Sequence, residues 1–97
     1  MHAAALRLEL RIRDPQSLKE KRRVVKSITS HVARTFGVAI AEVEHQDLWN
    51  RATLGVAAVA PQVSQLDRIL HSVERHMRER RDCELLGVSV SHLEKPE

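Results

Sequence analysis

The sequence predicts an α+β fold in which strands and helices follow the order strand, helix, strand, strand, helix, strand. Residues 2–12 alternate apolar and polar side chains, which is the period of a strand with one buried face. Residues 17–36 and 62–80 instead repeat apolar side chains at helical spacing. Three further stretches of strand length are rich in small, β-branched or leucine side chains: 38–44, 52–60 and 85–93.

The first helix is expected to begin after Ser17, because Ser17 and Glu20 match the capping signal S-x-x-E. Gly37 is expected to end it, since glycine readily adopts the left-handed conformation of a helix stop. One row of apolar side chains should face a core: Leu18, Val25, Ile28, Val32 and Phe36. Lys21 projects on this apolar side, so its stem should lie on the core with the ammonium at the edge.

The opposite side of this helix is basic. Its cations recur at helical spacing and are Lys19, Arg22, Arg23, Lys26 and Arg34. Residues 17–35 hold six Lys or Arg side chains and one carboxylate, a net charge of +5 in a chain whose total is +3. A polyanion such as RNA would relieve the repulsion between these cations and release counterions. A helix face that is merely solvated is the alternative interpretation.

The second helix has a different character. Its apolar row comprises Val63, Leu66, Leu70, Val73 and Met77, and its outward face mixes both signs of charge, which indicates ordinary solubility. Ser64 and Asp67 fit the acidic variant of the capping signal. The four histidines on separate elements have no ligand spacing and are interpreted as structural: His31, His71, His76 and His92.

Two right-handed crossovers of this length give a four-stranded antiparallel sheet with both helices on one face, the ferredoxin-like βαββαβ arrangement. Residues 1–94 should form this single domain, and residues 95–97 a frayed tail. The strand side chains expected to face the core include Leu54, Val56, Ala58, Leu86, Val88 and Val90.

By parity, the uncovered face of the sheet carries mostly small side chains, namely Ala3, Ala5, Arg7, Glu9, Ala39, Ala41, Val43, Thr53, Gly55, Ala57, Val59, Gly87, Ser89 and Ser91. Such a flat face could pack against a second copy of the chain to form a homodimer, or it could be a plain solvent face.

Composition excludes several functional classes. RNA-recognition motifs stack bases on aromatic side chains of the sheet, but this chain has only Phe36 and Trp49, and neither is expected on the open face. No glycine-rich phosphate loop or paired thiols are present, so no cofactor and no metal are expected. Cys83 is the sole cysteine, which indicates a reducing, cytoplasmic setting. No membrane span or signal peptide is expected.

A polar segment separates the second and third strands, and its role is left open. Its notable members are Glu42, His45, Gln46, Asp47, Trp49 and Arg51. His45 beside acidic groups could act as an acid or base, but no nucleophile accompanies it, so the favoured reading is a non-catalytic protein. Asp47 is expected to form a turn through local backbone bonds. Trp49 is expected to cap the core, with an exposed anchor for a partner as the alternative.

These residues resemble a known family. The segments Ser17–Arg22, Glu42–Val43, His45–Ala52 and Leu54–Val56, with Glu84–Leu86 near the end, are similar to the YlxP-like family of small bacterial proteins. The resemblance implies a ferredoxin-like domain of unassigned molecular function. The family's gene setting implies a link to the ribosome or to RNA. The sequence therefore predicts an RNA- or ribosome-associated binding protein, with rRNA or ribosomal subunits as partners. A homodimeric interaction module, using the open sheet face or the Trp49 loop, is the alternative.

Overall fold

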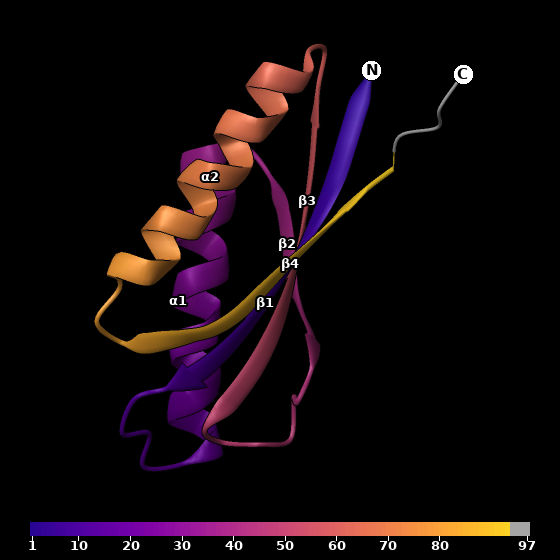
Figure 1. The fold of residues 1–97 in the computed structure, drawn as a ribbon. Coiled ribbons are helices and arrows are strands. Elements are labelled where there is room, and N and C mark those ends of the chain that lie inside the picture. The colour runs from indigo at the N-terminus through magenta and orange to yellow at the C-terminus, as the bar shows by residue number, and fades with distance from the viewer. Residues whose placement is uncertain (94–97) are drawn as a thin grey trace.

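The computed structural model describes residues 1–93, which form one sheet and two helices (Figure 1). The elements are β1 His2–Ile12, α1 Leu18–Phe36, β2 Ala39–Glu44, β3 Arg51–Ala60, α2 Val63–Glu79 and β4 Cys83–His92. All paired strands are antiparallel, and their order in the sheet is β2-β3-β1-β4. The predicted ferredoxin-like fold is thereby confirmed. The expected tail at residues 95–97 lies outside the described residues.

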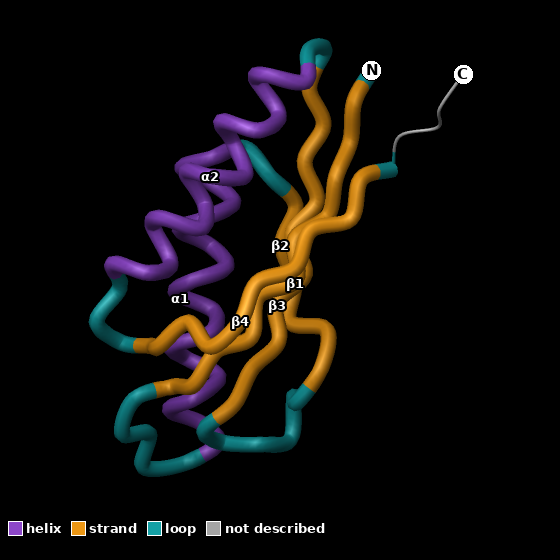
Figure 2. Tube along the Cα trace, viewed as in Figure 1, coloured by secondary structure: helices purple, strands orange, loops and turns teal. Residues whose placement is uncertain are grey.

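The core lies between the helices and one face of a twisted sheet, as Figure 2 shows. The central strands β1 and β3 supply the alternating row that the sequence predicted, and Leu8, Leu10 and Leu54 are completely buried. The helices close the core with rows at helical spacing: Val25, Ile28 and Val32 from α1, and Leu66, Leu70, Val73 and Met77 from α2. The sequence placed these rows correctly, because their period follows directly from helix and strand geometry. The exception is Val63, which was expected in the α2 row but is exposed at the start of the helix.

Both ends of α1 carry the predicted signals. The Ser17 hydroxyl accepts a hydrogen bond from the backbone N–H of Glu20 at 3.1 Å. The Glu20 carboxylate accepts from the N–H of Gln16, one residue before the partner that a standard capping box would use. Gly37 has a φ of 66° and donates its N–H to the carbonyl of Ala33. These hydrogen bonds fix the residue at which α1 begins, and the basic row starts in its first turn.

The start of α2 differs from the prediction. Gln62 is the residue before the first helical turn, and no side chain caps this end. The proposed capping signal at Ser64 and Asp67 is therefore wrong, because Ser64 already lies inside the helix. Ser64 cannot cap α2, because a capping side chain must come before the first helical residue.

The two edge strands, β2 and β4, each contain a bulge, and these bulges change which side chains face the core. In β4, Gly87 pairs with Glu9 and Leu85 pairs with Leu10, so Leu86 is the extra residue. The prediction that Leu86 faces the core is wrong, because strict alternation fails across a bulge. Leu85 packs against the core instead, and Leu86 is exposed. Val90, which was also expected to face the core, is exposed on this edge strand.

The bulge in β2 has a similar effect on the polar residues at the end of that strand. Glu42 pairs with Leu54 and Glu44 pairs with Thr53, which leaves Val43 as the extra residue. Glu42 consequently stays on the helix side of the sheet, whereas Glu44 turns to the open face. Because of the bulge, Glu42 can contact the helix side of the candidate site, whereas Glu44 contacts residues of the open face.

Candidate functional site

The basic row predicted from the sequence lies on the exposed face of α1, with four cations in its first half and Arg34 near its end. Its members, called the basic stripe from here on, are Lys19, Arg22, Arg23, Lys26 and Arg34, and all five are exposed. None of them forms an ion pair or side-chain hydrogen bond with any residue in the range 1–93. Arg7, Arg11, Arg78 and Arg80, in contrast, each pair with a carboxylate. The positive charge of the stripe is therefore uncompensated.

Lys21 lies on the other side of the same helix and is completely buried. Its ammonium donates to the Glu42 carboxylate at 2.5 Å and to the carbonyls of His45 at 3.0 Å and Gln46 at 3.4 Å. The prediction that this ammonium lies at the edge of the core is wrong. Burial is tolerated because the three donors of the ammonium meet one charged and two neutral acceptors.

These bonds fasten the loop between β2 and β3 to the first turn of α1. His45 adopts a left-handed conformation with a φ of 69°, and its carbonyl also accepts the N–H of Leu48 at 3.1 Å. At the other end of the loop, the carbonyl of Asn50 accepts the N–H of Ile12. The turn is closed by backbone atoms, and not by the side chain of Asp47 as expected from the sequence. The loop is thus tied to α1 and to β1.

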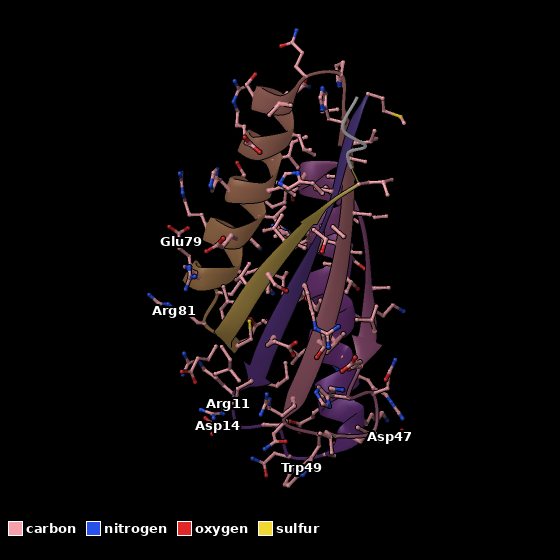
Figure 3. The ribbon with its side chains drawn as sticks, turned by 45° about the vertical axis from the view of Figure 1, so that its right-hand side comes forward. Arg11, Asp14, Asp47, Trp49, Glu79 and Arg81 are labelled. Atoms are coloured by element: carbon pink, nitrogen blue, oxygen red, sulfur yellow. The ribbon has the colours of Figure 1, made fainter. Side chains whose placement is uncertain are left out.

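Trp49 lies between these two attachments, at the end of the molecule (Figure 3). Its side chain is 53% exposed, so the prediction that Trp49 caps the core is wrong. The neighbouring Leu48 is also exposed. The backbone bonds that hold the loop across this end leave both side chains outside. No periodic signal in the sequence could have indicated this, because the loop follows neither a helix nor a strand period.

Arg51 begins β3 two residues after Trp49, and it pairs with Arg11 across the sheet. Arg11 contacts Glu84, whereas the Nε atom of Arg51 is buried without a hydrogen-bond partner in the described part of the chain. The rest of this side chain is partly exposed. The end of the molecule that carries Trp49 therefore holds a further cation that forms no ion pair with a carboxylate of residues 1–93.

The open face carries a small polar network beside this loop that sequence reasoning missed. Arg7 contacts Glu9 and, across the sheet, Glu44, each at 2.8 Å. Thr53 donates its hydroxyl to Glu9 at 2.6 Å, and this hydrogen bond, followed by the contact with Arg7, lowers the pKa of the Glu9 carboxyl. Alternation had placed Arg7, Glu9 and Thr53 on this face, but it gave no signal for Glu44, which joins them only because of the bulge in β2.

Two of the histidines interpreted as structural meet between α1 and α2. The rings of His31 and His76 stack with centroids 4.8 Å apart, and Phe36 contacts His76 edge-on. Burial, followed by the charge of nearby Arg80, lowers the pKa of His76. Among the described residues, no group of three or more His, Cys, Asp or Glu is arranged to hold a metal ion. Burial raises the pKa of the Cys83 thiol to about 11, which makes this cysteine unreactive.

A hollow of about 530 Å³ lies at the other end of the open face, away from Trp49. Its lining is mostly alanine and also includes Gly37, Val59, Ser91, His92 and Leu93. The small side chains that the sequence predicted for this face produce the hollow, because they leave the backbone of the sheet close to solvent. Over residues 1–93, no helix is long and apolar enough to cross a membrane.

The fold and the site define a ferredoxin-like domain with an unpaired basic helix face and an anchored polar loop. The chain belongs to the family described as "Protein of unknown function (DUF503)", which matches residues 3–90. It is 44% identical over 62 residues to "Uncharacterized protein YlxP" of Bacillus subtilis (strain 168), a match that covers 64% of this chain and 67% of the relative. The resemblance stated from the sequence is thereby confirmed.

A solved structure with similar topology is a de novo designed protein with a ferredoxin fold. The comparison gives a TM-score of 0.46 and 12% sequence identity, and it covers 100% of this chain and 88% of the designed one. Neither the family nor these relatives assigns an activity, so the function has to be argued from the site.

Proposed function

We propose that this protein is a non-catalytic, cytoplasmic RNA-binding factor that associates with ribosomal RNA through the basic stripe. The observation that supports this proposal is that none of the five exposed cations of α1 forms an ion pair with a carboxylate in the described range 1–93. Without Lys21, whose charge is paired with Glu42, residues 17–35 still hold five cations against one carboxylate, so positive potential is concentrated on the outer face of this helix.

The arrangement suits a phosphate backbone in length and in chemistry. From Lys19 to Arg34 the stripe extends for about 22 Å at the usual rise of an α-helix. Within it, the pairs Lys19–Arg23 and Arg22–Lys26 place like charges four residues apart, which costs about 0.2–0.5 kcal/mol for each pair. An RNA strand along the stripe would remove this repulsion and release condensed counterions. Phosphate contacts of this kind give affinity with little sequence readout.

The test is co-sedimentation with purified bacterial ribosomal subunits and with rRNA, over a series of salt concentrations. Binding should weaken as salt rises, and Lys19→Glu with Arg23→Glu should abolish it. A matched control is Arg68→Glu with Arg75→Glu, which makes the same change of charge on exposed residues of α2. Binding that survives reversal of the stripe, or that both double variants weaken equally, contradicts the proposal.

The alanine-lined hollow favours a second candidate, a homodimer formed through the open face. A second sheet could approach closely there, because the lining side chains are small and apolar. Sedimentation velocity should then show a dimer in the micromolar range that Ala57→Glu disrupts, since Ala57 is exposed within the hollow. A monomer at all these concentrations removes this candidate.

A further inference from the structure

We propose that Trp49 is a base-stacking platform and that the RNA bound by this protein is unpaired where it meets this side chain. The inference rests on the proposed function, because it names the form of RNA that the basic stripe would hold. It starts from the unusual position of the single tryptophan, on the surface at the end of the molecule (Figure 3).

The loop holds Trp49 in place before any ligand arrives. Three residues earlier, the carbonyl of Gln46 accepts the buried ammonium of Lys21, and one residue later Asn50 is bonded to Ile12. The backbone on both sides of the indole is therefore attached to the folded core. A stacking surface that is already ordered loses less entropy on binding than a mobile one, which favours a functional role for its exposure.

The charges around Trp49 indicate a polyanion. Lys21 anchors the loop on the inner face of α1, and Lys19 and Arg22 of the basic stripe lie within one turn of it along the helix, on the outer face. Arg51 adds a partly exposed cation on the sheet side of the loop. Asp47, an exposed carboxylate of the same loop, disfavours a phosphate beside it. The backbone of the ligand is therefore expected to run from Trp49 toward the stripe.

An indole can stack only on a base whose face is free. In a duplex the bases stack on one another, and protein side chains reach mainly phosphates and the shallow minor groove. In a single strand, loop or bulge, each base offers a free face, and stacking on an aromatic side chain tolerates any sequence. The combination of Trp49 with the basic stripe therefore fits unpaired RNA better than it fits a regular duplex.

Trp49 also supplies the measurement, because the chain has one tryptophan and no tyrosine. Its intrinsic fluorescence reports on this loop alone. The protein is titrated at low salt with an oligouridylate and with a fully paired RNA duplex that has the same number of phosphates. We expect the single strand to quench the fluorescence and the duplex to leave it nearly unchanged, even where both bind.

Variants separate stacking from charge. Trp49→Ala should weaken binding of the oligouridylate by about tenfold, in line with the loss of one stacked base, and leave binding of the duplex unchanged. Trp49→Phe should retain part of the affinity, because a phenyl ring can still stack. Affinities of these variants are measured by anisotropy of a labelled RNA, and circular dichroism checks that both are folded.

The outcomes distinguish this inference from the proposed function. Salt-dependent binding of the oligouridylate without quenching, and with unchanged affinity in Trp49→Ala, overturns the stacking role and leaves RNA binding by the stripe in place. Equal weakening of single-strand and duplex binding in Trp49→Ala also overturns it. Failure of the wild-type protein to bind either RNA at low salt overturns both.

Discussion

Helix α1 carries lysine on both of its faces, and the two faces use the same charge in opposite ways. On the inner face, the ammonium of Lys21 is removed from water and bonded to Glu42 and to two loop carbonyls. On the outer face, Lys19 and Lys26 are exposed and have no partner in the structurally described range. The charge on the inner face of α1 therefore stabilises the contact between the helix and the loop, whereas the charges on its outer face are available to a ligand.

The difference shows that a count of positive charges is a poor guide to a binding surface. Lys21 contributes to the net charge of +5 on residues 17–35, but its charge is taken up by the protein itself. The five members of the basic stripe carry the remaining cations of that segment. Binding and stability should consequently respond to different substitutions in the same helix.

The largest effect is expected on the inner face. Lys21→Met should lower the free energy of unfolding by about 3 kcal/mol, because it leaves a mostly buried carboxylate and two carbonyls without their donor. Urea unfolding measures the loss. The double variant Lys21→Met with Glu42→Met should be more stable than the single one, since no uncompensated charge is left. A loss of less than about 1 kcal/mol in the single variant would contradict the structural role of the pair.

A substitution at the N-terminal end of α1 should have an intermediate effect on the free energy of unfolding. Ser17→Ala removes the hydroxyl that accepts the N–H of Glu20 and should cost about 1 kcal/mol of stability. Thermal and urea unfolding both measure this change, with Ser30→Ala as a control at an exposed position inside the same helix. Equal effects of the two substitutions would argue against a specific cap.

On the outer face we expect a small change of the opposite sign. Arg22→Glu replaces a repulsion with Lys26 and with Lys19 by an attraction, so it should raise the free energy of unfolding by about 0.5 kcal/mol. The gain should disappear at high salt, which screens exposed charges. The same substitution should weaken RNA binding. A loss of stability that persists at high salt would mean that Arg22 has a structural role after all.

The smallest effect concerns pH and the contact between the two helices. The pKa of His76 is lowered in the folded protein, so the unfolded chain takes up a proton more readily. Stability should therefore decrease as pH falls below about 6.5, the usual value for an unfolded histidine, toward the lower folded value. Urea unfolding across this window measures the slope, which His76→Gln should reduce. An unchanged slope would place the effect on another group.

The fold could be predicted from the sequence because its information is local and periodic. The alternation in residues 2–12, the helical rows and the signals at Ser17 and Gly37 each depend on neighbours along the chain. The prediction failed at Leu86, where a bulge that depends on pairing with another strand breaks the alternation. A bulge is a property of two strands, and neither strand alone indicates it.

The candidate site was predictable only in part. The basic stripe follows from helical spacing, and its exposure is a consequence of the apolar row on the other side. The partner of Lys21, in contrast, lies 21 residues away along the chain, and the carbonyls that complete its surroundings belong to an irregular loop. The exposure of Trp49 depends on the same loop. These features arise from tertiary contacts, so composition and spacing could not determine them.

The two bulges have a consequence for how this protein behaves at high concentration. A flat edge strand offers unpaired N–H and carbonyl groups to which another chain can add a strand, and such addition leads to fibrous aggregates. In this domain both edges are interrupted, β2 at Val43 and β4 at Leu86, and β2 also ends in glutamates. Each bulge twists its edge locally and disrupts a regular ladder. The sheet is thus protected against growth at its borders, and further association should use its faces.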